Sequence, residues 1–429
     1  MLHCALMKMQ RPKGTHDRLP EEQALWKRVY QTVETVLSKA GVQEIDVPIF
    51  EASEVFQKSV GVSADLVVKK EMFQFEDGKG RSMTLRPEFT AGVMRAFIQN
   101  GMHMRPLPVK LWSMGPVFRA ENVQAGRYRQ FHQVNSEWLG LDSPLIDAEA
   151  IALLYEILGR LGVKNMVVKL GSVGDPQDRV AYNEYLRAQL EPQQASLSPD
   201  SQTRLRLNPM RILDSKHAGD QALIAKLKRP LDMVNPEARA HFDSVLSYLN
   251  AWHIPYEIDD SIVRGLDYYR RTAFEIHHQA IGAQSALCGG GRYDGLLETM
   301  GGPKLPGIGW AFGVERVLLA VADNSNKTPP SPLLYIVALD DEAVGEAATL
   351  ARTLRNYCHV EHGYGKRKVG KGLQDGDSRG AVFAALRGER ERRGGIYQIK
   401  HLASGEQYEV AEAELEAFLR QQGDRHAST

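Results

Sequence analysis

Hydrophobic and polar residues recur along the chain with two periods, which predict a mixture of helices and strands. Apolar residues three or four positions apart predict an amphipathic helix at 21–39 that ends at Gly41. Short β-type runs bounded by turn residues predict largely antiparallel strands. In the first hundred residues the expected elements are the helix 21–39, strands at 42–50, 72–75 and 82–85, and a helix at 91–99 capped by Thr90.

Residues 115–140 form the stretch richest in polar residues with a β pattern. Alternation over 115–121 and again over 129–138, joined by an Arg-rich connection with a glycine, predicts a β-hairpin with a long loop. Side chains two apart in a strand share a face. The shared faces hold Arg119 and Glu121 on the first strand and Arg129, Phe131, Gln133, Asn135 and Glu137 on the second. Such a face suits a nucleotide and a polar ligand, and an exposed sheet face explains this stretch equally well.

The middle of the chain interrupts the strand pattern. A helix at 146–161 and a strand at 166–170 are followed, from 175 to 256, by polar helices broken by prolines, which predicts an inserted helical unit. Later elements are expected as strands at 272–277, 333–339, 381–386, 396–400 and 408–411, a strand-to-helix unit at 307–322, and helices at 342–356 and up to Arg420. The stretch 323–332 has linker composition, so a small α/β domain is expected after it.

Composition and charge limit the class of protein. At 429 residues, with 43% hydrophobic and 25% charged residues, the chain is too long for one ordinary domain and has no apolar run long enough to span a membrane. The first residues lack the features of a secretory signal, so a cytoplasmic protein is expected. Three scattered cysteines and the absence of any metal-binding His spacing predict neither a disulfide framework nor a metal site. Basic and acidic residues balance at 53 each, so a polyanion would need a local basic surface.

Three further segments carry candidate chemistry. Arg316 lies in the first turn of the helix that follows Gly313, where it suits a terminal phosphate or, as the plainer alternative, pairs with a neighbouring acid on the helix surface. The glycines of GIGWAFG at 307–313 do not fit a dinucleotide fingerprint and are expected to allow close strand–helix packing. Before the 272–277 strand stand Arg264, Asp267, Tyr268 and Tyr269, which could orient a polar planar ligand; half-buried packing is the commoner role of two adjacent tyrosines. In the last domain Lys366, Arg367, Lys368 and Lys371 could meet phosphates, or form a solvated charged loop.

Six motifs occur in a characteristic order. They are KGTHD at 13–17, TLRPE at 84–88, the 115–140 hairpin, RGLDYY at 264–269, GGRYDG at 290–295 and GIGWAFGVER at 307–316. This order resembles that of the histidine–tRNA ligases, a family of class II aminoacyl-tRNA synthetases, along nearly the whole chain, and RGLDYY with GGRYDG discriminates most. The resemblance implies an α/β protein (an α+β catalytic core) with the class II antiparallel sheet flanked by helices. It divides the chain into a catalytic core at 1–175 and 256–325, a helical insertion at 176–255, a linker at 326–331 and a small anticodon-binding α/β domain at 332–429.

The resemblance also implies roles for individual residues. On the ATP side it implies that Arg119 holds the α-phosphate, Glu121 reads the adenine amino group, Phe131 stacks on the base, and Arg127 and Arg316 hold the γ-phosphate. On the histidine side it implies Glu88, Thr90 and Gln133 for the α-amino group, Glu137 with Tyr269 for the imidazole, and Tyr268 close by. Arg264 resembles a second catalytic arginine beside Arg119. Phe89 stands where the family usually has glycine, which is costly if the backbone there needs a positive φ.

The implied activity has two steps. ATP, with Mg²⁺, activates L-histidine to histidyl-adenylate and pyrophosphate, and the histidyl group then passes to the 3′-terminal ribose of its tRNA with release of AMP. A homodimer formed near the amino end, around the 21–39 helix and Pro48, is implied, and no structural metal. The rival interpretations are a regulatory paralogue that partners ATP phosphoribosyltransferase, a synthetase-derived tRNA sensor, and a class II synthetase for another amino acid.

Overall fold

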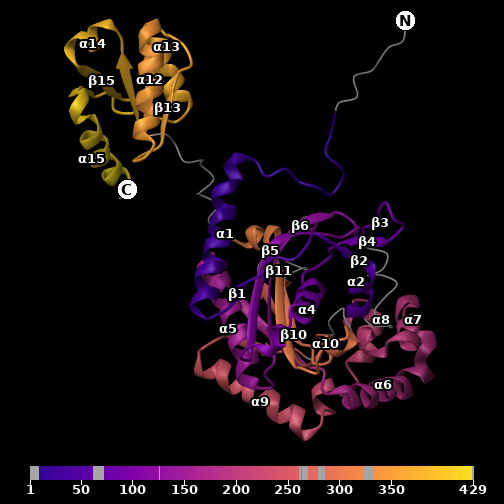
Figure 1. Cartoon of the computed structure of the whole chain (residues 1–429). Helices are drawn as coiled ribbons and strands as arrows, with labels where there is room; N and C mark the ends of the chain where they lie inside the picture. The colour runs from indigo at the N-terminus through magenta and orange to yellow at the C-terminus, as the bar shows by residue number, and fades with distance from the viewer. Residues whose placement is uncertain are drawn as a thin grey trace, which may run out of the picture. The chain divides into compact units, whose positions relative to one another are not determined.

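The computed structural model describes residues 9–60, 72–124, 126–259, 262, 269–278, 286–321 and 333–427. It contains two compact units, the larger made of residues 1–19 and 25–326 and the smaller of residues 20–24 and 327–429 (Figure 1). Arg264, Asp267, Tyr268 and the expected linker 326–331 lie outside the described residues, so the proposed roles and boundaries that depend on them stay predictions. In the described part of the chain, no helix is both long and apolar enough to cross a membrane.

An eight-stranded sheet forms the centre of the larger unit. Its central six strands are antiparallel, and one further strand pairs in parallel at each edge, which confirms the predicted antiparallel catalytic sheet. In spatial order the strands are β1 (Gln43–Glu44), β5 (Val109–Phe118), β6 (Gln130–Leu139), β11 (Gly307–Gly313), β10 (Ala286–Arg292), β9 (Arg270–His278), β7 (Met166–Ser172) and β8 (Tyr256–Ile258). A second sheet contains β2 (Phe50–Ala52), β4 (Ser82–Leu85) and β3 (Gln74–Glu76), and β3 with β4 confirms the predicted early hairpin.

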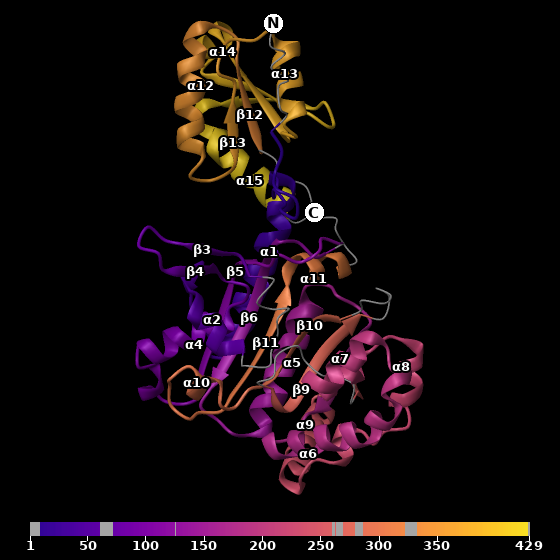
Figure 2. The same ribbon diagram turned by 90° about the vertical axis from the view of Figure 1, so that its right-hand side faces the viewer.

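Helices flank the large sheet and form the expected insertion. In the core they are α1 (Pro20–Lys39), α2 (Ser53–Val60), α4 (Thr90–Gln99), η1 (Met102–Met104), α5 (Pro144–Arg160), α10 (Leu296–Thr299) and α11 (Val314–Ala320). The insertion holds α6 (Pro176–Leu190), η2 (Glu191–Ser196), α7 (Pro199–Leu207), η3 (Pro209–Asp214), α8 (Ala218–Ile224), η4 (Pro230–Asp232) and α9 (Pro236–Ala251), gathered at one side of the larger unit (Figure 2). Prolines near the first turns fix φ where no amide donor is needed, which is why so many of these helices begin at proline.

The two faces of the large sheet differ sharply in side-chain size. On one face, large apolar residues pack against helices α1, α5 and α9 in the main hydrophobic core; they include Val134, Trp138, Phe274, Ile276, Trp310 and Phe312. Because side chains alternate along each strand, the register puts small and polar residues on the opposite face. These are Gln133, Asn135, Glu137, Gly289, Gly291, Gly309 and Ala311. A sheet face lined by glycine and alanine beside polar groups leaves room for a ligand.

Three predicted details of the larger unit are wrong. The strand expected at 42–50 is interrupted between Glu44 and Phe50, in a stretch where Pro48 lacks an amide donor for a ladder. Thr90 is the first residue of α4 rather than its cap, and the Ala91 amide donates instead to the Glu88 carboxylate at 3.0 Å.

The first strand of the hairpin also ends earlier than predicted. β5 ends at Phe118, so Arg119 and Glu121 lie in the connection rather than in the strand. One further backbone hydrogen bond, from the Arg119 amide to the Arg129 carbonyl at 2.8 Å, continues the pairing beyond the strand. The start of the connection is therefore fixed by the hairpin although it is not a strand.

The smaller unit is the expected α/β domain. Its sheet has the order β13 (Val360–His362), β12 (Leu334–Ala338), β14 (Phe383–Arg387), β15 (Ile396–His401) and β16 (Gln407–Ala411), with helices α12 (Asp341–Leu354), α13 (Val369–Ser378), α14 (Glu389–Gly394), η6 (Glu412–Glu414) and α15 (Leu415–Ala427). The pattern did not predict β13, α13 or α14. Lys371 consequently lies in α13, and it pairs with Asp375, as Lys366 pairs with Asp341.

Candidate active site

A cavity of about 350 Å³ opens on the small-residue face of the large sheet. Five of its lining residues are those expected to bind ATP: Arg119, Glu121, Arg127, Phe131 and Arg316. Gln133, expected on the histidine side, lines the same cavity. The remaining lining residues are Gly126, Glu275, Ala286, Leu287, Cys288, Gly289, Ala311, Phe312 and Gly313. The fold thus brings the hairpin, β9, β10 and the β11–α11 turn to one site.

Glycines shape this face by making room for side chains from neighbouring strands. A Cβ on Gly309 would lie 1.9 Å from Glu137 Oε2, and one on Gly291 would lie 2.7 Å from Tyr269 Cδ1. Gly291 and Gly309 are direct partners in the β10–β11 ladder, so their missing side chains point to the same face. Glu137 and Tyr269, the pair expected to recognise imidazole, therefore lie over adjacent strands on one face.

Two of the glycines of 307–313 have a different role from the one predicted. A Cβ on Gly307 would lie 2.5 Å from the Tyr293 ring, and one on Gly313 would lie 3.8 Å from Phe131. Gly307 and Gly309 therefore face site residues, whereas a Cβ on Gly313 would also lie 4.0 Å from Arg316 Cβ in α11. Close strand–helix packing is thus the wrong explanation for Gly307 and Gly309, which give clearance to side chains of the site.

One end of the site is rich in guanidinium groups. Arg119 Nε donates to the Pro87 carbonyl at 2.9 Å, and the Arg119 guanidinium lies 5.3 Å from the centre of the Phe131 ring. Arg127 lies 3.8 Å from the Glu121 carboxylate. Burial lowers the pKa of Arg316, and the positive charge of Arg127 lowers it further. Three arginines around one cavity suit a polyanion such as a triphosphate.

Beyond Gln133, outside the cavity lining, lies a largely buried group of oxygen acceptors that includes Glu137, Glu88 and Thr90. Burial raises the pKa of Glu137 to about 8, and the negative charge of Glu88 also raises it. Loss of water likewise raises the pKa of Glu88. Glu137 accepts hydrogen bonds from Thr90 Oγ1, from Asn135 Nδ2 at 3.0 Å and from the Tyr293 hydroxyl. This end suits a ligand with a positive charge or several N–H donors.

The raised pKa of Glu137 predicts a pH-dependent stability. The folded protein binds this proton more tightly than the unfolded chain, so Glu137 lowers stability progressively as pH rises from about 4.5 to about 8. We expect Glu137→Gln to remove this slope and to melt at a higher temperature than the parent at about pH 9. Thermal melts across this range test it, with the surface variant Glu156→Gln as control. A parent and a Glu137→Gln variant with parallel melting profiles would contradict the prediction.

The backbone at Phe89 does not have the positive φ that would make a bulky residue costly there. Phe89 has φ −96°, so the position does not require glycine. Its side chain is fully buried, and the Arg86 guanidinium lies 4.2 Å from its ring centre. The bulky residue is therefore part of the core beneath Glu88 and Thr90.

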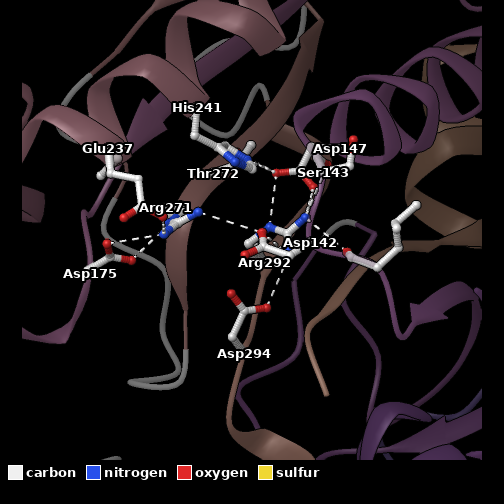
Figure 3. Close-up of polar contacts among 12 residues, drawn as sticks. Asp142, Ser143, Asp147, Asp175, Glu237, His241, Arg271, Thr272, Arg292 and Asp294 are labelled. Carbon is white, nitrogen blue, oxygen red and sulfur yellow. Dashed lines mark hydrogen bonds and ion pairs between the residues drawn. The ribbon is translucent and has the colours of Figure 1, made fainter. Parts of the chain in front are cut away.

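Behind the sheet, GGRYDG builds a buried network of charges (Figure 3). Arg292 is fully buried and donates to Asp147 on α5 at 2.6 Å. The same carboxylate accepts from Thr272 Oγ1 at 2.7 Å and lies 2.9 Å from His241 Nε2 on α9. The hydroxyl of the neighbouring Tyr293 donates a hydrogen bond to Glu137. The GGRYDG motif therefore contributes both to the buried charge network and to the candidate site.

A second group of ion pairs joins β9 to the insertion. Arg271 has a φ of +49°, a conformation that residues with a Cβ rarely adopt. Its guanidinium contacts Asp175 at the start of α6 at 2.9 Å and Glu237 on α9 at 2.8 Å (Figure 3). These pairs hold the strained start of β9 against the helical insertion.

Three residues of the site have no individual role assigned from the sequence. Tyr293 contacts Glu137, Glu275 lines the cavity, and Asn135 is fully buried beside Glu137. Tyr293 lay in a motif already recognised as discriminating, and Asn135 on a face already recognised as polar. Among the described residues, no group of three or more His, Cys, Asp or Glu side chains is placed to hold a metal ion.

Comparison with known proteins gives matches over both units. Residues 14–317 match the family of histidyl-tRNA synthetase, and residues 333–422 match the anticodon binding domain. A histidine–tRNA ligase of Thermus thermophilus is 52% identical over 413 residues, covering 95% of this chain and 98% of that protein. That of Deinococcus deserti is 50% identical over 436 residues, covering 98% and 97%. The crystal structure of apo Staphylococcus aureus histidyl-tRNA synthetase matches with a TM-score of 0.81 at 33% identity, covering 96% of this chain and 100% of that one.

Proposed function

Since the chain belongs to the histidyl-tRNA synthetase family, we propose that its candidate site binds ATP at the arginine end and L-histidine at the acceptor end. The chain is a class II aminoacyl-tRNA ligase that activates histidine with ATP and transfers it to tRNA. The observation that carries the proposed site is its polarity: three guanidinium groups line the cavity, and the buried carboxyl groups of Glu88 and Glu137 lie beyond Gln133, outside the cavity lining. ATP is an anion and histidine presents N–H donors, so each substrate has one matching end.

In the first step a histidine carboxylate oxygen attacks the α-phosphorus, and the bond from that phosphorus to the bridging oxygen of pyrophosphate breaks. Negative charge builds on the α-phosphate, and we assign Arg119 to stabilise it. Its contacts with the Pro87 carbonyl and the Phe131 face orient the guanidinium before ATP binds. Arg127 and Arg316 are assigned to the γ-phosphate, and Glu121 and Phe131 to adenine. Because both reactants are anionic, positioning and charge neutralisation account for most of the acceleration.

Histidine recognition is assigned to the acceptor end. Glu88, Thr90 and Gln133 are proposed for the α-amino group, and Glu137 with Tyr269 for the imidazole, with Tyr268 assigned to the same side. Buried acceptors reject an analogue that lacks the donors, because it leaves them unpaired, a mismatch worth on the order of 10⁴-fold in comparable sites. Histidine can therefore be selected without an editing domain.

Mg²⁺, tRNA, oligomeric state and location complete the proposal. Glu275 lines the cavity and would be available to Mg²⁺, because one or two carboxylates with phosphate oxygens form a usual ligand set for this ion, which neutralises phosphate charge when bound. The 3′-hydroxyl of the tRNA is proposed to attack the histidyl carbonyl and release AMP, with the smaller unit binding the anticodon.

We further propose a homodimer formed near the amino end and a cytoplasmic location, which is where charged tRNA is used.

ATP–pyrophosphate exchange tests the function directly. We expect purified protein with Mg²⁺ to exchange only when histidine is present, and to charge tRNA for histidine. A regulatory paralogue would bind histidine without exchange, but the ATP arginines and the second unit, which such paralogues tend to lose, are both retained. Exchange that is absent in a well-folded preparation would overturn the assignment.

The role of Arg264 needs its own test. We expect Arg264→Ala to lower the rate of adenylation far more than it lowers histidine affinity, because the charge that it would stabilise develops only as the α-phosphorus is attacked. Single-turnover adenylate formation and equilibrium histidine binding measure the two quantities separately. A loss confined to histidine affinity would remove Arg264 from the catalytic step.

A further inference from the structure

We infer that Asn135 is a further specificity residue, whose side-chain oxygen accepts a hydrogen bond from the imidazole N–H of bound histidine. The inference rests on the proposed function in one respect, namely that the acceptor end of the site binds histidine. It concerns an atom to which neither the motifs nor the family resemblance gives a role.

Asn135 lies on the sheet face that bears the candidate site. It lies in β6 midway between Gln133 and Glu137, and all three share a face because side chains alternate in a strand. Its partner in β11 is Ala311, and the residue opposite Ala311 in β10 is Gly289. Both of these small residues line the cavity, and Asn135 itself is buried beside them on the same sheet face.

The orientation of the amide follows from Glu137. Asn135 Nδ2 lies 3.0 Å from Glu137 Oε1, which also accepts from Thr90. An amide nitrogen donates and a carboxylate oxygen accepts, so the amide nitrogen is directed toward Glu137. The opposite atom, Asn135 Oδ1, is left as an acceptor beside the residue assigned to imidazole.

That oxygen is buried and has no hydrogen-bond partner among the described residues. Asn135 is fully buried, and buried polar atoms in folded proteins nearly always have a partner. Gln133 Oε1, on the same face, is unpartnered in the same way. Gln133 lines the cavity and Asn135 lies two residues along the same sheet face, so we take the missing donors to come from the bound histidine.

Glu137 alone offers little further accepting capacity. A carboxylate accepts about four hydrogen bonds, and Thr90, Asn135 and Tyr293 already donate to it. The Asn135 amide therefore serves twice: its nitrogen orients Glu137, and its oxygen provides an acceptor next to it. A ring with an N–H group fits this pair better than a ring without one.

A substrate comparison tests the inference. In 4-thiazolylalanine the ring keeps a nitrogen acceptor but has sulfur in place of the N–H group. We expect Asn135→Ala to weaken histidine binding about 10- to 100-fold and to change 4-thiazolylalanine binding by less than about 3-fold. Binding is measured by competition in the exchange assay, together with the KM for ATP, which should stay near the parental value. Equal losses for histidine and 4-thiazolylalanine would overturn the inference. An unchanged histidine affinity would also overturn it, since it would mean that water rather than histidine bonds to the Asn135 oxygen in the parent protein.

Two controls separate this inference from the assignment of the site. Ser136→Ala changes an equally buried neighbour on the opposite face, whose hydroxyl donates to the Leu111 carbonyl, and should leave histidine affinity unchanged. Glu137→Gln should lose histidine binding if the site is assigned correctly. If Glu137→Gln loses histidine binding and Asn135→Ala keeps it, only the inference about Asn135 fails. If both variants keep histidine binding, the proposed histidine site fails.

A second variant covers the case of poor folding. If Asn135→Ala does not fold, Asn135→Ser removes the amide with a smaller change in polarity. Thermal stabilisation by histidine and by ATP, measured separately, then reports binding without turnover. A reduced shift with histidine and a parental shift with ATP supports the inference, and parental shifts with both contradict it.

Discussion

Replacing Asp147 with asparagine is expected to lower the free energy of unfolding by about 3–5 kcal/mol. Its carboxylate is fully buried and lies 2.6 Å from the Arg292 guanidinium, which is itself fully buried. The amide would leave that guanidinium charged and without its main counterion, and water cannot reach it. Despite the cost of burial, hydrogen bonds and the charge of Arg292 hold the pKa of Asp147 below its ordinary value. Denaturant titration at neutral pH measures the loss.

An exposed ion pair on a helix that borders the same network provides the control. Asp243 lies 3.0 Å from Arg239 on α9, and both side chains are about half exposed. Because water and salt screen such pairs, Asp243→Asn is expected to cost less than about 1 kcal/mol. Similar losses of unfolding free energy in Asp147→Asn and Asp243→Asn would show that burial does not make the Asp147–Arg292 pair more stabilising than an exposed pair.

Replacing Arg119 with alanine is expected to slow adenylate formation by about 10²- to 10³-fold, with a smaller effect on histidine binding. The guanidinium is oriented by the Pro87 carbonyl and by Phe131, so its charge is in place before the α-phosphate becomes more negative. Arg119→Lys should recover little of the rate, because an ammonium cannot form the planar two-pronged contact. Rapid-quench measurement of a single turnover isolates this step.

Arg18 is the matched control for Arg119. Its guanidinium also lies against an aromatic ring, 4.4 Å from the centre of Trp26, but it does not line the cavity. Arg18→Ala should therefore leave the rate of adenylation near the parental value. If the two alanine variants behaved alike, the distinction between cavity and non-cavity arginines would be wrong.

The fold could be predicted where periodicity was strong. The apolar stripe of α1, the hairpin of β5 and β6, and the β11–α11 turn appear close to where their patterns placed them. The pattern failed for α13, where Gly370, Gly372 and Gly376 lower the local helix preference. Burial of Gly372 and Gly376 against Val337 and Tyr335 explains how tertiary packing overrides that preference.

The candidate site could be predicted only in part. Arg119, Phe131 and Gln133 follow a two-residue period or a short motif, so their shared cavity was foreseeable. The hydrogen bond between Glu137 and Tyr293 spans 156 positions, and that between Asp147 and Arg292 spans 145. No local pattern encodes such pairs, because they depend on the strand order β6–β11–β10 and on the placement of α5.

The contacts of α9 bear on how the chain could be re-engineered. A segment inserted between two strands is often treated as a removable accessory that a short linker can replace. Here its deletion would take away His241 and Glu237, and with them one partner of Asp147 and one of Arg271. A chimera that exchanges the helical segment with a relative must therefore carry matching groups on both sides of the junction. The helical insertion therefore supplies side chains that help to hold helix α5 and strand β9 of the catalytic core in place.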